Sequence, residues 1–261
     1  MSETATNYFK RQPPTDSSVP RVIEAQNIHK SFDGKQILNG LSFTLHKSEN
    51  LVVLGRSGTG KSVLIKCLVG LIPPDEGELC ILGQNIMALD KEEDWMEIRR
   101  KVGFLFQGGA LYDSMSVREN LEFPLKRQPD PMPKGEMKDA IAEVLGHVGL
   151  LDAINKMPSE LSGGMKKRIA LARTLVLKPE IVLYDEPTTG LDAITSREIS
   201  ELILHMRETY GVSSVIITHD MPCARITANR IAILHEGRFG AEGTYDELES
   251  SGEEWVRSYF E

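Results

Sequence analysis

The chain has 261 residues, of which 41% are hydrophobic and 26% are charged, and its formal net charge is −8. This length allows one domain, or a tight pair of subdomains, with a buried core. The apolar runs are too short to cross a bilayer, and the acidic balance disfavours nucleic-acid binding. Residues 1–20 predict a flexible tail without a signal peptide. The scattered cysteines Cys67, Cys80 and Cys223 suit free thiols in a reducing compartment.

The first half of the chain predicts strands and one helix around a glycine-rich loop. Residues 22–45 alternate apolar and polar side chains about the turn Asp33-Gly34, which predicts an antiparallel strand pair. The next expected elements are a buried strand at 51–54, a helix at 62–71 and a strand at 100–106.

The second half of the chain begins with a more polar, helical stretch at 116–151, with expected breaks at Pro124 and at 129–133. Strand-like runs at 181–184, 215–218 and 231–234 then alternate with helical stretches, and short helices are expected from Thr244. Such alternation indicates an α/β fold with a largely parallel sheet.

The glycine-rich loop after the strand at 51–54 matches the phosphate-loop pattern G-x-x-x-x-G-K-[ST]. Its residues are Gly55, Arg56, Ser57, Gly58, Thr59, Gly60, Lys61 and Ser62. Glycines let several backbone N–H groups point at one anion, and the helix that follows adds its N-terminal dipole. Lys61 is expected to reach the β and γ phosphates of ATP, and the Ser62 hydroxyl to bind Mg²⁺.

A pair of acids, Asp185 and Glu186, ends the strand-like run at 181–184. Parallel sheets place the carboxyl ends of their strands beside the nucleotide. Asp185 is therefore expected to hold Mg²⁺, and Glu186 to act as general base on the attacking water. Without the phosphate loop, an acidic turn before Pro187 would be the better interpretation.

The segment Leu161-Ser162-Gly163-Gly164-Met165 lies at the start of a predicted helix. Ser162, Gly163 and Gly164 are suited to a second anion site, although in isolation an N-cap and turn would be the better interpretation. The basic run at 166–168 is expected to be a solvated helix face.

This segment resembles the signature of the ATP-binding subunits of ABC transporters, and the rest of that pattern follows in order over about residues 22–243. The resemblance implies that Phe32 stacks on adenine, that Gln107 touches Mg²⁺ and the attacking water, and that His219 contacts the γ-phosphate. Taken singly, these residues would be a core phenylalanine, a polar strand end and a structural histidine. Gly190-Leu191-Asp192 matches the loop that joins two active sites, or else a helix start capped by Asp192.

Two positions depart from the ABC pattern. Met165 replaces the usual glutamine of the signature. Val63 stands where many relatives have a second hydroxyl, and its backbone N–H is expected to keep the phosphate contact.

The stretch at 106–117, with Glu119-Asn120 and Phe123-Pro124-Leu125 after it, looks like the Mla-type ATPases of bacterial phospholipid transporters. That resemblance implies a head-to-tail dimer of this chain, integral membrane permease subunits and an MCE-domain lipid-binding subunit. It also implies a peripheral position on the cytoplasmic side of the bacterial inner membrane.

The fold class expected from these patterns is an α/β P-loop NTPase, with a RecA-like core of the ABC type. An N-terminal antiparallel β subdomain and an inserted helical subdomain at about 108–165 complete an ATPase domain at 21–261. Other functions stay open: an ABC ATPase for another substrate, a cell-division or regulatory ABC ATPase, and a soluble ABC protein of translation or DNA repair.

Overall fold

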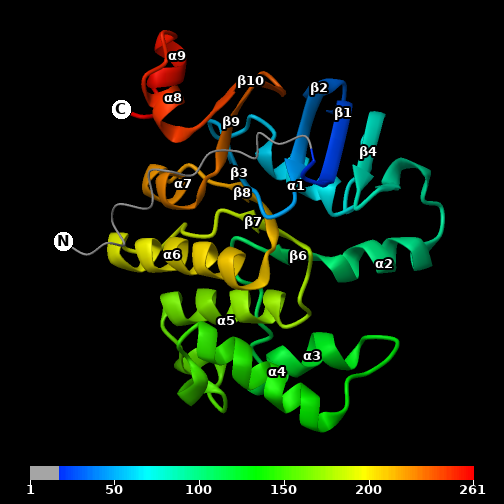
Figure 1. Cartoon of the computed structure of the whole chain (residues 1–261), viewed down its shortest axis with the longest axis vertical. Coiled ribbons are helices and arrows are strands. Elements are labelled where there is room, and N and C mark those ends of the chain that lie inside the picture. The colour runs from blue at the N-terminus through cyan, green and yellow to red at the C-terminus, as the bar shows by residue number, and fades with distance from the viewer. Residues whose placement is uncertain (1–17) are drawn as a thin grey trace.

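The structure is a computed structural model that describes residues 18–261. The flexible tail predicted for residues 1–20 falls almost wholly outside this range. Two β-sheets stand side by side, and helices cover the larger one in layers (Figure 1). None of the helices in the described part of the chain is long and apolar enough to span a membrane.

The smaller sheet is antiparallel and has the strand order β2-β1-β4-β5. Its strands are β1 (Arg21–Phe32), β2 (Lys35–His46), β4 (Glu76–Ile81) and β5 (Gln84–Asn85). β1 and β2 pair around Asp33-Gly34, which confirms the predicted hairpin.

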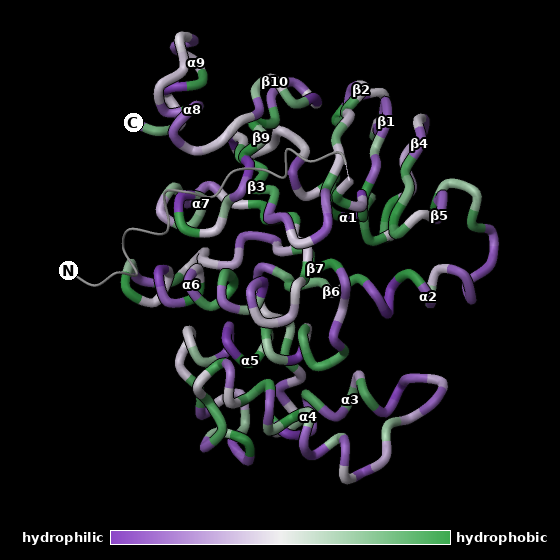
Figure 2. Tube along the Cα trace, in the orientation of Figure 1, coloured by the Kyte–Doolittle hydropathy of each residue, from purple (hydrophilic) through white to green (hydrophobic). Residues whose placement is uncertain are grey.

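The larger sheet has the order β10-β9-β3-β8-β7-β6, and the five strands from β9 to β6 are parallel. Its strands are β3 (Asn50–Leu54), β6 (Val102–Leu105), β7 (Ile181–Asp185), β8 (Ser213–Ile217), β9 (Arg230–His235) and β10 (Arg238–Gly243). The apolar runs of the central parallel strands β3, β7, β8 and β9 are buried on both faces, as such strands require. In Figure 2 hydrophobic colours run along these strands, whereas the loop after α3 is hydrophilic.

The α-helices lie on both faces of the parallel sheet. They are α1 (Lys61–Leu68), α2 (Glu92–Lys101), α3 (Val117–Lys126), α4 (Lys134–His147), α5 (Gly163–Leu175), α6 (Ala193–Tyr210), α7 (Met221–Thr227), α8 (Tyr245–Glu249) and α9 (Glu254–Arg257). Short 3₁₀ turns occur at Ile86–Ala88, Leu151–Ala153 and Pro158–Glu160.

Alternation along β3 divides the core into two clusters. Leu51 and Val53 pack with α1 and the antiparallel sheet, whereas Val52 and Leu54 pack with α5, α6 and the helices beyond. Successive side chains of a strand point to opposite faces, so α1 and α5 lie on opposite sides of the parallel sheet (Figure 1).

Two expected boundaries are wrong. Pro124 does not break α3, because a capping box of Ser116 and Glu119 starts the helix and Leu121 and Leu125 bury its inner face. These contacts outweigh the roughly 3 kcal/mol that an internal proline costs. The strand expected at 100–106 starts at Val102, because residues 99–101 form a basic last turn of α2, which favours the helix end.

A buried ion pair joins the two sheets. The carboxylate of Glu49, fully buried before β3, accepts a 2.8 Å hydrogen bond from Nε of Arg230 on β9. Arg230 also contacts Glu242 on β10 and donates to the Thr44 carbonyl of β2. The guanidinium therefore connects β2, β9 and β10.

We predict that Glu49→Ala lowers the free energy of unfolding by about 3–5 kcal/mol, because it leaves a largely buried guanidinium without its buried partner. Glu242→Ala is the matched control, since Glu242 is 32% exposed and its loss should cost about 0–1 kcal/mol. Urea denaturation of both variants measures the difference. Equal losses would contradict the role assigned to Glu49.

Candidate nucleotide site

The loop between β3 and α1 is shaped by its glycines. Gly60 has φ 105°, in the left-handed region, and a Cβ there would lie 3.0 Å from Cγ2 of Ile37. A side chain on Gly55 would approach the Leu234 carbonyl to 3.0 Å and the Thr59 hydroxyl to 2.7 Å. The tight curl of the loop therefore needs glycine at both positions.

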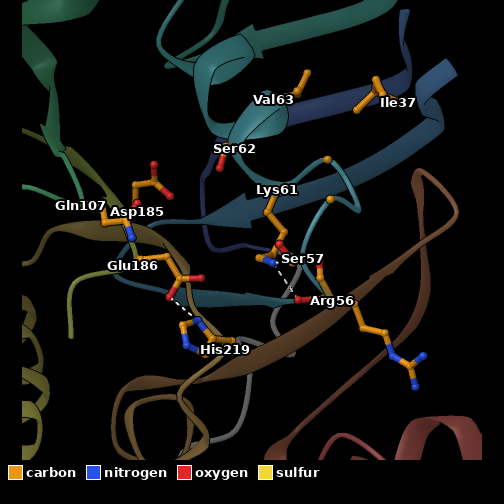
Figure 3. Close-up of a pocket in the computed structure, with 13 residues that line it drawn as sticks. Ile37, Arg56, Ser57, Lys61, Ser62, Val63, Gln107, Asp185, Glu186 and His219 are labelled. Carbon is orange, nitrogen blue, oxygen red and sulfur yellow. Dashed lines mark hydrogen bonds and ion pairs between the residues drawn. The ribbon is translucent and has the colours of Figure 1, made fainter. Parts of the chain in front are cut away.

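Lys61, the first residue of α1, turns its ammonium back onto this loop. Nζ donates to the Gly55 carbonyl at 2.7 Å and to the Arg56 carbonyl at 3.1 Å (Figure 3). Burial lowers the pKa of Lys61, whereas the charges of Glu186 and Asp185 act in the opposite direction. A partly desolvated cation with carbonyl partners is suited to an incoming anion.

The acid pair lies at the carboxyl end of β7. Burial raises the pKa of Asp185, and the neighbouring Glu186 adds to the shift. Glu186 itself is in the left-handed region, at φ 51°. Its backbone N–H donates to the Ile217 carbonyl at 2.9 Å, and its carboxylate accepts from the Thr189 hydroxyl at 3.1 Å. Nδ1 of His219 lies 2.8 Å from Oε2 of Glu186. A strained acid fixed by several contacts is a common feature of catalytic sites.

Ser62, Gln107 and Asp185 present oxygen-bearing side chains to the same pocket (Figure 3). Hydroxyl, amide and carboxylate oxygens are ligand types that Mg²⁺ accepts, and this ion commonly takes further ligands from phosphates and water. Within residues 18–261 no group of three or more His, Cys, Asp or Glu residues forms a metal site. The donor set therefore fits Mg²⁺ that is bound together with a nucleotide, and not a closed protein cage.

A pocket of about 690 Å³ brings together most of the residues predicted from the sequence. Its lining comprises Ile37, Gly55, Arg56, Ser57, Gly58, Gly60, Lys61, Ser62, Val63, Gln107, Asp185, Glu186 and His219. Ile37 was missed. The only sequence signal for it is its place in the alternating strand β2, and its packing against Gly60 appears only in three dimensions.

Phe32 and Thr59 do not line this pocket. Phe32 ends β1, is 43% exposed and carries the ammonium of Lys30 5.3 Å from its ring centre. The Thr59 hydroxyl donates to the Arg56 carbonyl at 2.9 Å and so stabilises the loop from within. The N–H of Val63 donates to the Gly60 carbonyl at 3.0 Å.

Ser162, Gly163 and Gly164 are also absent from the pocket lining. Ser162 caps α5 and accepts a 3.2 Å hydrogen bond from the Met165 N–H. A Cβ on Gly164 would lie 2.6 Å from Cγ2 of Thr195, so this glycine lets α5 approach the start of α6. Asp192 caps α6 through the N–H groups of Ile194 and Thr195. The N-terminus of α1, at the phosphate loop, and the N-terminus of α5, at Ser162, are therefore separate places in this chain.

The expectation of a solvated basic face at 166–168 is wrong for Lys167. Its neighbour Lys166 is exposed, but Lys167 is 7% exposed and points inward. Its ammonium donates to the Gln107 carbonyl, and to the Glu186 carbonyl at 3.5 Å. Sequence reasoning missed it because one residue in a basic run gives no sign of which way it faces.

Comparison with known proteins agrees with this fold. Residues 38–189 match the ABC transporter family. The chain is 39% identical to protein TRIGALACTOSYLDIACYLGLYCEROL 3, chloroplastic, of Arabidopsis thaliana, over 94% of this chain and 74% of that one. It is 38% identical to "Probable ribonucleotide transport ATP-binding protein mkl" of Mycobacterium tuberculosis, over 91% of this chain and 66% of that one.

Solved structures give the same result. The dimeric structure of MJ0796, a bacterial ABC transporter cassette, superposes with a TM-score of 0.77 at 33% identity, covering 85% of this chain and 98% of that one. The structure of cbiO1 from Clostridium perfringens, part of the transporter complex cbiONQ, gives 0.82 at 26% identity, with 91% and 94% covered.

Fold and pocket together define a P-loop ATPase cassette, in which an antiparallel sheet flanks a parallel core. The chain belongs to the ABC transporter family, binds ATP and is an ATP hydrolase of that type. The predicted fold class is confirmed.

The raised pKa of Asp185 predicts how the acid pair affects stability. Because the folded state holds this proton more tightly than the unfolded state, the ionised carboxylate costs stability above its folded pKa, and the cost disappears as pH falls toward the ordinary value of 3.8. Near neutral pH, Asp185→Asn should therefore melt above the wild type when nucleotide is absent and a chelator is present. The gap should close in acid.

Asp192→Asn is the control of opposite sign. Hydrogen bonds from Thr195 lower the pKa of Asp192. Its charge therefore stabilises the folded state at pH values above the ordinary pKa of an aspartate, and this stabilisation is lost as pH falls through the lowered pKa. This variant should melt at or below the wild type near neutral pH. An Asp185→Asn protein that melts lower than the wild type there would contradict the burial cost.

Proposed function

We propose that the chain is the ATP-hydrolysing subunit of a transporter that moves phospholipid between bacterial membranes. Residues 21–261 form the ATPase domain, with a helical subdomain at about 108–165. The subunit works as a dimer with integral membrane permeases and an MCE-domain subunit. Its contact with the cytoplasmic face of the inner membrane is made through those partners. The pocket that joins the phosphate loop to Asp185 and Glu186 is the observation that carries the ATPase part.

ATP binds with its phosphates on the loop at 55–62. The loop N–H groups and the α1 dipole receive the anion, and Lys61 exchanges its carbonyl contacts for phosphate oxygens. Ser62, Gln107 and Asp185 would hold Mg²⁺, which when bound would supply positive charge against the phosphate oxygens. The roles of Phe32 with adenine and of Val63 with phosphate rest on the resemblance alone.

Glu186 orients and polarises the attacking water. Its carboxylate lies in the pocket beside Gln107 and the loop, and Thr189 and His219 fix its position. His219 contacts Glu186 and also lines the pocket. From this position its ring reaches the γ-phosphate of the bound ATP. A general base that is held in one place contributes more to the rate than a mobile one.

The second half of each site comes from another copy of the chain. Lys61 begins α1 on one face of the sheet, and Ser162 caps α5, which packs on the other face. Two copies packed head to tail bring Ser162, Gly163 and Gly164 of one copy to the nucleotide of the other. The related MJ0796 cassette has a dimeric structure.

A groove of about 450 Å³ next to Gln107 is the proposed permease contact. Phe104, Phe106, Tyr112 and Phe123 give it aromatic walls, and Phe106 and Tyr112 are each 43% exposed. Arg173 supports one wall by donating to the Ala110 carbonyl at 2.7 Å. An apolar segment of a permease that enters here touches the same stretch that carries Gln107, so permease movement and the site are coupled.

The lipid assignment rests on the segment at 106–125 and on the relative whose name contains a diacylglycerol lipid. The relatives named for ribonucleotide transport and for methionine import, at 38% and 36% identity, favour an ABC ATPase for another substrate as the second candidate. A cell-division or regulatory ABC ATPase is a further alternative. The partners that purify with the chain distinguish these functions.

Glu186→Gln tests the hydrolytic assignment. It should bind ATP normally, lower kcat by more than about 100-fold because the general base is lost, and accumulate as a dimer in ATP. Glu180→Gln, the same change just before the other end of β7, should leave kcat unchanged. Steady-state ATPase assays and size-exclusion chromatography measure both. Normal turnover of Glu186→Gln would exclude the assignment.

Purification from native membranes tests the transporter assignment. The chain should purify with permease and MCE-domain chains and with bound phospholipid. Tyr112→Glu should reduce the recovered permease at least about 10-fold because it removes an aromatic anchor from the groove. Leu151→Glu, which changes an apolar residue that is 49% exposed and lies outside the groove, is the control. Recovery of amino-acid or metal importer subunits would replace the lipid assignment.

A further inference from the structure

Lys167 is a buried cation that the ATPase mechanism above does not use. It lies one turn into α5, five residues after the Ser162 cap. No carboxylate lies within salt-bridge distance of its ammonium among the described residues, and its hydrogen-bond partners are backbone carbonyls. A lysine buried to this extent without a carboxylate partner is costly, so its position in the interior calls for a specific role.

The two carbonyls belong to the two segments that bear the reacting groups. One is that of Gln107, two residues after the end of β6, and the other is that of Glu186, directly after β7. Neither segment is in regular secondary structure at this point, so the ladder of the sheet does not fix either carbonyl. Lys167 connects them to each other and to α5.

Glu186 in particular needs such support. Its φ of 51° is unfavourable for a residue with a side chain, and strain of this kind costs on the order of 1–3 kcal/mol. The Ile217 carbonyl holds its N–H, and Thr189 and His219 hold its carboxylate. Its carbonyl accepts from the Thr189 N–H at 3.3 Å and from Lys167 at 3.5 Å. Loss of Lys167 leaves this carbonyl with the Thr189 contact alone, so the peptide after Glu186 is held less firmly and the carboxylate can shift.

The adjacent basic residues do not duplicate this contact. Lys166 is exposed, and Arg168 pairs with Glu198 on α6 at 2.5 Å. The acid pair acts on Lys167 from a greater distance: burial lowers the pKa of its ammonium, and Asp185 and Glu186 oppose that shift.

We propose that Lys167 is a positioning residue, which ties the helix that begins with Ser162 to Gln107 and to Glu186 of the same chain. The inference rests on the proposed function, because it takes Glu186 as the base and α5 as the helix that meets the partner's nucleotide. Any shift of α5 on closure then moves Gln107 and Glu186 together, so the chain's own site responds to the nucleotide of its partner.

Lys167→Met in the full chain tests this, since methionine keeps an unbranched side chain but removes the donor. We expect kcat for ATP to fall about 10- to 100-fold through misplacement of Glu186, with KM changed less than about 3-fold because the phosphate loop is untouched. Lys167→Arg, which keeps donors and charge, should retain most of the rate. Lys166→Met is the matched control and should behave as wild type.

A kcat for Lys167→Met that matches Lys166→Met, with both proteins folded by thermal melting, would overturn the proposal. A parallel rise in KM would also do so, since it would mean a general disturbance of the site. Where Lys167→Met does not fold, Lys167→Leu, which also lacks a donor, is judged by the same two results. Normal turnover by Glu186→Gln would instead refute the proposed function, so the two failures are distinguishable.

Discussion

Two carboxylates and two lysines share the half-buried end of β7, and the rest of the site depends on their balance. Asp185 is the last residue of the strand and Glu186 follows it, whereas Lys61 and Lys167 come from helices on opposite faces of the sheet. Burial lowers the pKa of both lysines and raises that of Asp185, because it disfavours the charged forms. The opposite charges of the lysines and the carboxylates offset part of that cost. The parallel sheet with a helix on each side makes this arrangement possible.

The same balance explains why the site is ready for an anion and a cation together. Lys61 donates its hydrogen bonds to loop carbonyls, which are weaker acceptors than the charged oxygens of a phosphate. Asp185 carries a charge that burial disfavours and that Mg²⁺ would stabilise. A nucleotide bound with its metal relieves both costs, and binding energy obtained in this way can drive the closure of two copies.

Much of the fold and site could be predicted from the sequence, because the decisive signals are local. The phosphate loop needs its glycines at fixed spacing, and the apolar run before Asp185 and Glu186 defines β7. Pro124 and Lys167 were misjudged because their outcome depends on partners far away in the chain. The capping box and buried face of α3 outweigh the proline, and the inward turn of Lys167 depends on carbonyls at 107 and 186. Ile37 likewise reaches the pocket only through packing on Gly60.

The central claim is that each ATP site is shared between two copies, since the helix that starts at Ser162 lies across the sheet from the one that starts at Lys61. The most direct measurement mixes Lys61→Ala chains with Ser162→Arg chains, each inactive alone, and follows ATP hydrolysis. A shared site predicts that activity returns, because each mixed dimer has one site with both residues intact. A mixture as inactive as its components, in which mixed dimers are detected, would contradict the account.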